Sequence, residues 1–122
     1  MSDARHALVV DDNQMNRKLA IAFLKRLGWT ADEAQSGGEA LDRVRDQRYD
    51  AVLLDLRMPV MSGESVCRAI RAEPRFAELP VIAYTAHAMI EEKQQILGVG
   101  FNALLIKPTS FSDFKNVFEA IG

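Results

Sequence analysis

Ala51-Val52-Leu53-Leu54-Asp55 is a short, unbroken run of aliphatic residues that ends in a carboxylate. Such a run is typical of a β-strand that is covered on both faces, as the strands of parallel sheets are. Similar apolar runs occupy residues 7–10, 81–84 and 103–106. A fifth segment, Thr30–Ala34, is more polar, and we predict that it forms an edge strand.

Between these runs, apolar residues recur every three or four positions, which is the period of an amphipathic helix. Ser36 and Glu39 have the spacing of a capping box at the start of the second helix. Glycine commonly ends a helix, and Gly28 and Gly98 stand where the first and fourth helices, the latter near residues 88–97, would stop. The first stripe consists of Met15, Leu19, Phe23 and Leu27, with Ala20 and Leu24 beside it. The third and fifth helices are predicted from Val66, Ala69 and Ile70, and from a stripe after Ser110 made of Phe111, Phe114, Val117, Phe118 and Ile121.

Strands and helices therefore alternate five times along the chain. Strands that alternate with helices of this length form parallel βαβ units, with helices on both faces of the sheet. The chain has 122 residues, of which 48% are hydrophobic and 26% are charged, which suits one globular domain and leaves little room for a second. We predict a single α/β domain over residues 1–122, with a doubly wound five-stranded parallel sheet and five helices.

Composition limits the classes of function. The one cysteine, Cys67, allows no internal disulfide and favours a reducing, cytoplasmic compartment, and its apolar neighbours predict a buried, inert thiol. No apolar run is long enough to cross a bilayer, and the first residues lack the apolar core of a signal peptide. The net charge of -2 gives no electrostatic reason to expect nucleic-acid binding. We expect neither a membrane nor a nucleic acid as a partner.

The residues just beyond the strands are the candidates for chemistry, because such sheets bind ligands outside the carboxyl ends of their strands. Asp11 and Asp12 follow the first strand, Asp55 ends the third, Thr85 follows the fourth and Lys107 follows the fifth. Three carboxylates, a hydroxyl and an ammonium group are thus expected at one edge of the sheet.

This set of groups suits phosphoryl transfer. Clustered carboxylates call for a cation, and Mg²⁺ prefers oxygen ligands that include one or two carboxylates. An ionised aspartate can attack phosphorus and form an aspartyl phosphate, a reaction that depends on positioning and charge neutralisation. Taken singly, Asp11 and Asp12 could merely cap a helix, Asp55 could belong to a turn and Lys107 could be solvated. Their joint occurrence favours the functional interpretation.

Four segments carry a resemblance to a known family. They are Val9-Val10-Asp11-Asp12-Asn13, Leu54-Asp55-Leu56-Arg57-Met58-Pro59-Val60-Met61-Ser62-Gly63, Tyr84-Thr85-Ala86-His87-Ala88-Met89 and Ile106-Lys107-Pro108. In this order the set resembles the receiver domains of two-component response regulators, above all the receivers of hybrid histidine kinases and phosphorelays. The resemblance implies a flavodoxin-like (βα)5 fold with strand order 2-1-3-4-5.

The resemblance also implies roles for the candidate residues. Asp55 would accept a phosphoryl group from a phosphohistidine. Mg²⁺ would be held by Asp12 directly, by Asp11 mostly through water, by Asp55 and by the backbone carbonyl of Arg57. Lys107 would pair with the aspartyl phosphate across a cis peptide to Pro108, and Thr85 would act as the switch.

Partners follow from the same resemblance. The donor would be a sensor histidine kinase or a histidine phosphotransfer protein, and such a protein would dock near Gln14, Met15 and Pro108. The receiver itself is expected to be a monomer. One departure is Leu104, at a position where many receivers carry Tyr or Phe; we hypothesise that output here does not depend on an aromatic rotamer.

Several alternatives stay open. The domain could be a stand-alone regulator, which Met1 favours, or a receiver fragment of a hybrid histidine kinase. It could be an aspartyl-phosphate phosphatase, but the haloacid dehalogenase family places a second aspartate where Arg57 stands here. A degenerate receiver is disfavoured because the pocket residues are intact. Residues 98–103 mimic the dinucleotide fingerprint G-x-G-x-x-A but are predicted to end a helix. His6 and His87 lack the spacing of metal ligands.

Overall fold

The computed structural model describes residues 4–86 and 89–121. His87 and Ala88 lie outside the described residues, as does the predicted start of the fourth helix near residue 88. The elements, in chain order, are β1 (His6–Val10), α1 (Gln14–Arg26), β2 (Thr30–Ala34), α2 (Gly37–Asp46), β3 (Ala51–Asp55), α3 (Gly63–Arg71), the 3₁₀ turn η1 (Pro74–Phe76), β4 (Val81–Thr85), α4 (Ile90–Val99), β5 (Ala103–Ile106) and α5 (Phe111–Ala120).

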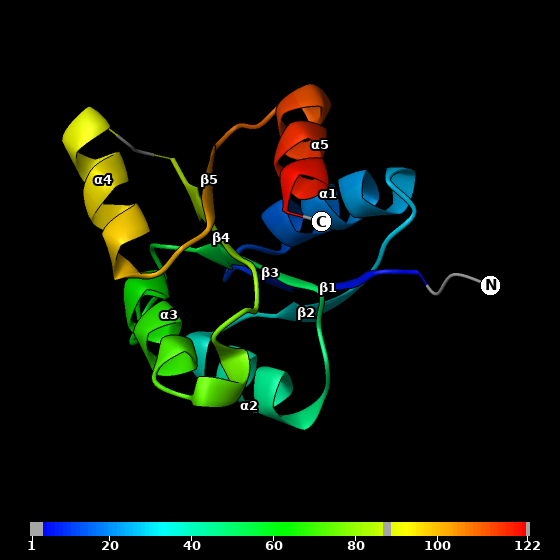
Figure 1. The fold of residues 1–122 in the computed structure, drawn as a ribbon. Helices are drawn as coiled ribbons and strands as arrows, with labels where there is room; N and C mark the ends of the chain where they lie inside the picture. The colour runs from blue at the N-terminus through cyan, green and yellow to red at the C-terminus, as the bar shows by residue number, and fades with distance from the viewer. Residues whose placement is uncertain (1–3, 87–88, 122) are drawn as a thin grey trace.

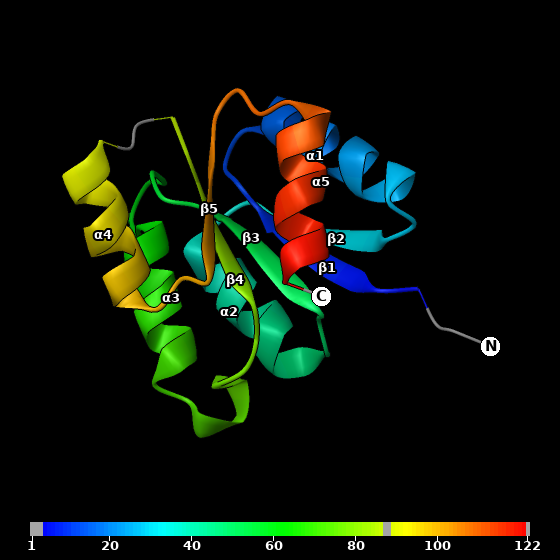
Figure 2. The same cartoon turned by 45° about the horizontal axis from the view of Figure 1, so that its top comes forward.

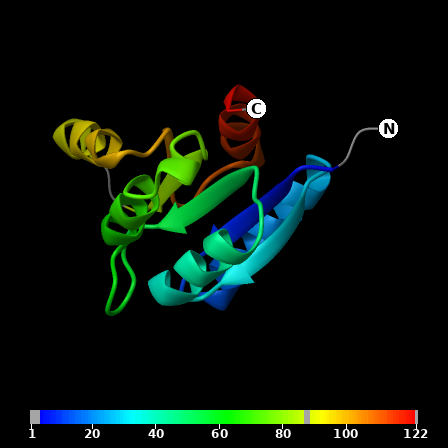
Figure 3. The ribbon, with the colours of Figure 1, turned by 60° about the horizontal axis from the view of Figure 1, so that its bottom comes forward.

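The strands form one parallel sheet in the order β2-β1-β3-β4-β5. The predicted fold class, strand order and edge position of Thr30–Ala34 are thereby confirmed. Helices α1 and α5 cover one face of the sheet, and α2, α3 and α4 cover the other (Figure 1, Figure 2). In Figure 3, α2 lies in front of β2 and α1 lies behind it. None of the helices in the described part of the chain is long and apolar enough to cross a membrane.

Two apolar clusters hold these layers together, because successive side chains of a strand point to opposite faces. Leu8 and Leu54 lie with Cys67 in the cluster under α2, α3 and α4, and Cys67 is fully buried as predicted. The other cluster lies under α1 and α5, where Phe114 and Phe118 of the predicted C-terminal stripe are stacked at 4.5 Å between ring centroids. Burial on both faces explains why β1, β3 and β4 carry continuous apolar runs, whereas the edge strand β5 is apolar but only partly buried.

The predicted apolar face of α1 is partly wrong. Met15 is 73% exposed and Leu19 is 41% exposed, whereas Ala20 and Leu24, predicted beside the stripe, are buried. An α-helix has 3.6 residues per turn, so residues spaced by four drift by about 40° around the helix at each step. A stripe spaced by four therefore cannot stay on the buried face over the whole length of α1.

The end of α4 also differs from the prediction. Gly98 lies inside the helix, and Gly100 ends it with a φ of 130°, a backbone conformation that favours glycine. The segment that mimics a dinucleotide fingerprint thus closes α4 and leads into β5, as predicted. Its glycines serve helix termination rather than phosphate binding.

Candidate functional site

The carboxyl edge of the sheet gathers the predicted residues. Asp55 and Thr85 are the last residues of β3 and β4, Asp11 and Asp12 directly follow β1, and Lys107 directly follows β5. Asp11, Asp55 and Thr85 are almost fully buried, at 1%, 5% and 2% exposure, while Asp12 is exposed. One carboxylate oxygen from each aspartate lies within 4.8 Å of the others. The structure therefore brings together all three carboxylates.

Lys107 reaches this acidic cluster from the end of β5, the edge strand beside β4. Its Nζ lies 2.9 Å from Oδ2 of Asp11 and 3.3 Å from Oδ1 of Asp55. Its backbone N–H donates to the carbonyl oxygen of Thr85 at 2.8 Å, and the peptide bond to Pro108 is cis, as the family resemblance implied. The ammonium group also lies 4.8 Å from the centroid of the Tyr84 ring.

Backbone N–H groups fix the two buried carboxylates. Asn13 donates its backbone N–H to Oδ1 of Asp11 at 2.9 Å, and Arg57 donates its own to Oδ1 of Asp55 at 3.2 Å. The N-cap of α1 is Asn13, whose side chain accepts from the backbone N–H of Asn16 at 3.0 Å. Neither Asp11 nor Asp12 caps the helix, so the interpretation of this pair as a simple cap is wrong.

Ionisation reflects the crowding of charge. Burial and the neighbouring charge of Asp11 raise the pKa of Asp55, and Lys107 opposes this only in part. Burial alone would lower the pKa of Lys107, but its contacts with Asp11 and Asp55 outweigh burial and raise that pKa. Three carboxylates face one ammonium group, which leaves negative charge for a further cation. Oxygen donors at this spacing fit a hard divalent ion such as Mg²⁺.

Thr85 and Arg57 line a pocket of about 220 Å³ beside the acidic cluster. The pocket continues between α3 and α4, where Glu64, Arg68, Glu92 and Gln95 also line it.

Leu104, which stands where many receivers carry an aromatic residue, is partly buried against the cluster under α2, α3 and α4. Arg57 itself is exposed.

The loop after Asp55 depends on a close approach of two backbones. Gly63 donates its N–H to the carbonyl oxygen of Leu56 at 3.0 Å and closes the loop. A Cβ atom at Gly63 would overlap the carbonyl oxygen of Asp55. At the tip of the loop, Val60 is fully exposed and has a φ of 71°, which strains a β-branched residue. Met61 donates its N–H to the carbonyl oxygen of Pro59 at 2.8 Å across this tip.

The sequence did not indicate Arg17, which bonds to the backbone of Asp11. Its Nη1 donates to the carbonyl oxygen of Asp11 at 2.7 Å, and its Nε donates to Oε1 of Glu33 at 2.9 Å. An arginine on a helix that ends in Lys25 and Arg26 carries no distinctive signal in the sequence. Only the packing of α1 beside β2 shows what Arg17 touches.

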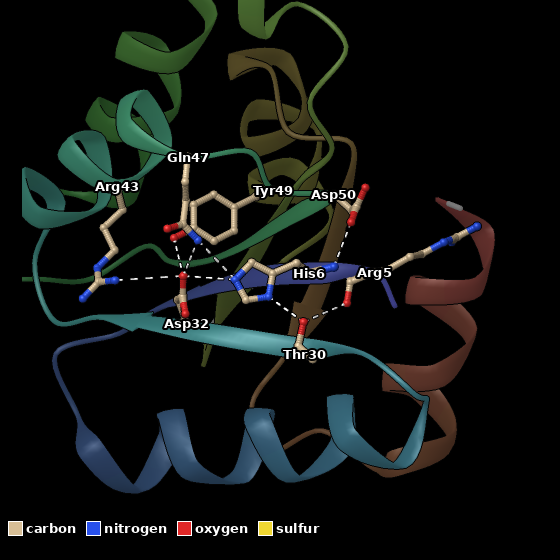
Figure 4. A network of polar contacts seen from close by, with 8 residues as sticks. All are labelled: Arg5, His6, Thr30, Asp32, Arg43, Gln47, Tyr49 and Asp50. Carbon is tan, nitrogen blue, oxygen red and sulfur yellow. Dashed lines mark hydrogen bonds and ion pairs between the residues drawn. The ribbon is translucent and has the colours of Figure 1, made fainter. Parts of the chain in front are cut away.

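A second polar cluster lies at the opposite end of the sheet (Figure 4). The ring of His6 contacts Oγ1 of Thr30 at 2.6 Å and Oδ2 of Asp32 at 3.0 Å, and it stacks on Tyr49. Asp32 also accepts hydrogen bonds from the Tyr49 hydroxyl at 2.8 Å and from the Gln47 amide at 2.6 Å. These contacts tie the edge strand β2 to the segment that enters β3.

Comparison with known proteins places the chain in a family. A family model described as the response regulator receiver domain matches residues 7–119. The signal transduction histidine-protein kinase BarA of Escherichia coli K12 is 38% identical over 105 residues, which cover 86% of this chain and 11% of that kinase. The polar-differentiation response regulator DivK of Brucella anthropi is 33% identical over 110 residues, which cover 90% of this chain and 89% of DivK.

A solved structure supports the same placement. The receiver domain of the sensor histidine kinase PA1611 from Pseudomonas aeruginosa superposes with a TM-score of 0.88 and 33% identity, over 97% of each chain. That structure has a magnesium ion coordinated in its active-site cleft. With the family match over residues 7–119, these likenesses show that the chain belongs to the response regulator receiver domains of two-component signal transduction.

Proposed function

We propose that Asp55 accepts a phosphoryl group from a phosphohistidine of a sensor histidine kinase or a histidine phosphotransfer protein. The observation that carries this proposal is the close set of three carboxylate oxygens, within 4.8 Å of one another, with one ammonium group beside them. Such a set is costly to keep together unless it serves a cation and a charged reaction.

Asp11, Asp12 and Asp55, with the backbone carbonyl of Arg57, would hold Mg²⁺. When bound, the ion would neutralise the cluster and the charge of the phosphoryl oxygens. The magnesium ion in the related receiver of PA1611 supports this assignment. Asp12 suits direct contact with the ion because its carboxylate is exposed, whereas Asp11 and Asp55 are recessed and already bonded to Lys107.

The remaining groups of the site act on charge and position. A carboxylate oxygen of Asp55 would form the new O–P bond while the N–P bond of the phosphohistidine breaks and its electron pair stays on the imidazole. Lys107 lies 3.3 Å from Oδ1 of Asp55, so its ammonium group can follow the charge onto the phosphoryl oxygens. Thr85, at the end of the adjacent strand, would donate its hydroxyl hydrogen to a phosphoryl oxygen and so report phosphorylation.

The domain would catalyse only its own phosphorylation and dephosphorylation and would turn over no separate substrate. The relatives use such a domain in two settings, as most of the response regulator DivK and as a small part of the kinase BarA. We favour a stand-alone regulator or phosphorelay receiver that acts as a monomer, with a receiver of a hybrid histidine kinase as the second candidate. An aspartyl-phosphate phosphatase is not favoured.

The intact mass of the protein after incubation with a small phosphodonor tests this proposal. With acetyl phosphate and Mg²⁺, we expect the mass to increase by one phosphoryl group in the wild type and to stay unchanged in Asp55→Ala. The adduct should also disappear when EDTA removes the metal. No adduct with either acetyl phosphate or phosphoramidate would contradict the proposal that this pocket itself promotes the transfer.

A further inference from the structure

We propose that Arg17 is a positioning residue that sets the Mg²⁺ affinity of the acidic cluster by fixing the backbone from which Asp12 projects. This inference rests on the proposed function, because it assigns Arg17 a role toward the same metal site. Arg17 would touch neither the metal nor the phosphoryl group. Its effect would pass through the main chain of Asp11.

The side chain of Arg17 is well placed for this role. It is only 12% exposed, although it belongs to the second turn of a surface helix. Its guanidinium group donates to the carbonyl oxygen of Asp11 at 2.7 Å and to the carboxylate of Glu33 at 2.9 Å. One planar group thus connects helix α1, the loop that carries the acidic pair and the edge strand β2.

Together with its other hydrogen bonds, these contacts hold the backbone and the side chain of Asp11 in place. Its N–H donates to the carbonyl oxygen of Ala34 at 3.1 Å, and its carbonyl oxygen accepts from Arg17. Its two carboxylate oxygens accept from Asn13 and from Lys107, each at 2.9 Å. Every polar group of Asp11 therefore has a partner. Removing Arg17 would leave its carbonyl oxygen without the one side-chain donor that reaches it within the described residues.

The side chain of Asp12 differs from that of Asp11, because no polar contact within the described residues holds it. The structure shows no hydrogen bond or ion pair for the Asp12 side chain in the described part of the chain, and the residue is exposed. The position of its carboxylate is therefore set by the backbone of residues 11–13. Metal ligands lose roughly 10- to 100-fold in affinity when the groups that orient them are removed. Arg17 is such a group for Asp12.

The ion pair of Arg17 with Glu33 makes it possible to distinguish a positioning role of Arg17 from an effect of its charge on Mg²⁺ binding. Glu33 belongs to β2 and lies outside the acidic cluster, so the charge of Arg17 is balanced without taking a carboxylate from the cation. If Arg17 acts by positioning, Arg17→Lys should bind Mg²⁺ more weakly than the wild type, because a single ammonium group cannot reproduce the two directed bonds of the guanidinium fork. If only charge matters, Arg17→Lys should bind Mg²⁺ as the wild type does.

Isothermal titration of the purified protein with MgCl₂ measures this directly. We expect Arg17→Lys and Arg17→Gln each to raise the dissociation constant for Mg²⁺ by about 10-fold or more. Glu33→Gln keeps an oxygen that can accept from Arg17 and should stay within about twofold of the wild type. Lys18→Gln is the matched control, because it removes a positive charge from the neighbouring exposed position of α1, and it should also stay within about twofold.

Each outcome bears on the inference. If Arg17→Lys binds Mg²⁺ as tightly as the wild type while Arg17→Gln binds it weakly, the positive charge of Arg17 and not its positioning of the backbone would set the affinity, and the inference would be wrong. Affinities within about twofold in both variants would overturn the inference and leave the proposed metal site intact. Failure of the wild type to bind Mg²⁺ would overturn both. As a second readout, the rate of phosphorylation by acetyl phosphate should recover in Arg17→Lys at saturating Mg²⁺, which a variant with a damaged fold would not show.

Discussion

The ammonium nitrogen of Lys107 lies 2.9 Å from the carboxylate oxygen Oδ2 of Asp11, although 96 residues separate the two in the sequence. The contact joins the ends of two strands that are not neighbours, since Asp11 follows β1 and Lys107 follows β5, with β3 and β4 between them. Asp11 is 1% exposed, so its charge has little help from water. In the absence of metal, the ammonium group of Lys107 therefore balances part of the negative charge of the cluster and so stabilises the folded domain.

Replacing Lys107 should therefore weaken the fold as well as the reaction. In Lys107→Met, the recessed carboxylates of Asp11 and Asp55 lose their only ion pair in the described residues, and we expect the free energy of unfolding to fall by about 2–4 kcal/mol. Urea denaturation in EDTA measures the loss, and saturating Mg²⁺ should restore part of it. Lys115→Met, at an exposed position of α5, is the control. Equal stability of the two variants would show that Lys107 is not needed to balance the cluster.

Gly63 should tolerate no side chain. Because a Cβ atom there would overlap the carbonyl oxygen of Asp55, Gly63→Ala must push the start of α3 away from the end of β3. We expect this to cost about 2–4 kcal/mol of unfolding free energy and to slow phosphorylation of Asp55. Gly38→Ala is the control: Gly38 lies in α2 with nothing within 4 Å of a Cβ atom, so alanine should stabilise by up to about 1 kcal/mol. Equal effects of the two changes on stability would refute the close approach.

Val60 should be replaceable with a gain in stability. Its φ of 71° is unfavourable for a β-branched residue, and its full exposure means that no packing is lost with the side chain. We expect Val60→Gly to raise the free energy of unfolding by about 1 kcal/mol and Val60→Ala, which keeps a Cβ atom, to raise it by less. Chemical denaturation compares the three proteins. A loss of stability in Val60→Gly would mean that the valine side chain makes stabilising contacts.

Asp32 should make stability depend on pH. Burial opposes its charge, but hydrogen bonds from His6 and Tyr49 outweigh burial and lower the pKa of Asp32 in the folded protein. A lowered carboxyl pKa contributes stability that is fully present above the unfolded value, near 4, and is lost as the pH falls through the folded value. We expect Asp32→Asn to cost about 1–2 kcal/mol at pH 7, and the difference from the wild type should shrink in acid.

Denaturation with urea at pH 7 and near pH 3 tests this, with Asp46→Asn as the control at an exposed position of α2. The phenol of Tyr49 offers an independent reading. Burial and the hydrogen bond to Asp32 raise the pKa of Tyr49 to about 12, so this pKa should fall in Asp32→Asn. A constant cost of Asp32→Asn from pH 7 to pH 3 would show that folding does not lower the pKa of Asp32 and would contradict this prediction.

The fold and the placement of the site residues could be predicted because both follow from local patterns with strong physical causes. A strand buried on both faces must be apolar throughout, so residues 51–54 were recognisable without any tertiary information. Parallel strands bring their carboxyl ends to one edge, which is enough to gather Asp11, Asp55 and Lys107. The cis peptide before Pro108 could be expected only from the family resemblance.

Other features depend on packing that no local pattern specifies. Met15 and Leu24 both belong to the predicted apolar face of α1, but only the direction in which α1 packs on the sheet decides that Leu24 is buried and Met15 is exposed. Gly98 and Gly100 are equally good helix terminators in the sequence, and only Gly100 takes the positive φ. Arg17 touches Asp11 because α1 lies beside β2 with Glu33 within reach. Contacts of this kind require the tertiary structure.

The central claim, that Asp55 is the phosphoryl acceptor, is tested most directly by locating the adduct. Sodium borohydride reduces an acyl phosphate to an alcohol, so a phosphorylated aspartate becomes homoserine and can be identified by peptide mass mapping. After treatment with acetyl phosphate and Mg²⁺, we predict homoserine at position 55 and aspartate unchanged at positions 11 and 12. Homoserine at position 11 or 12 with Asp55 unmodified, or a phosphorylated protein with no reducible aspartate, would contradict the account.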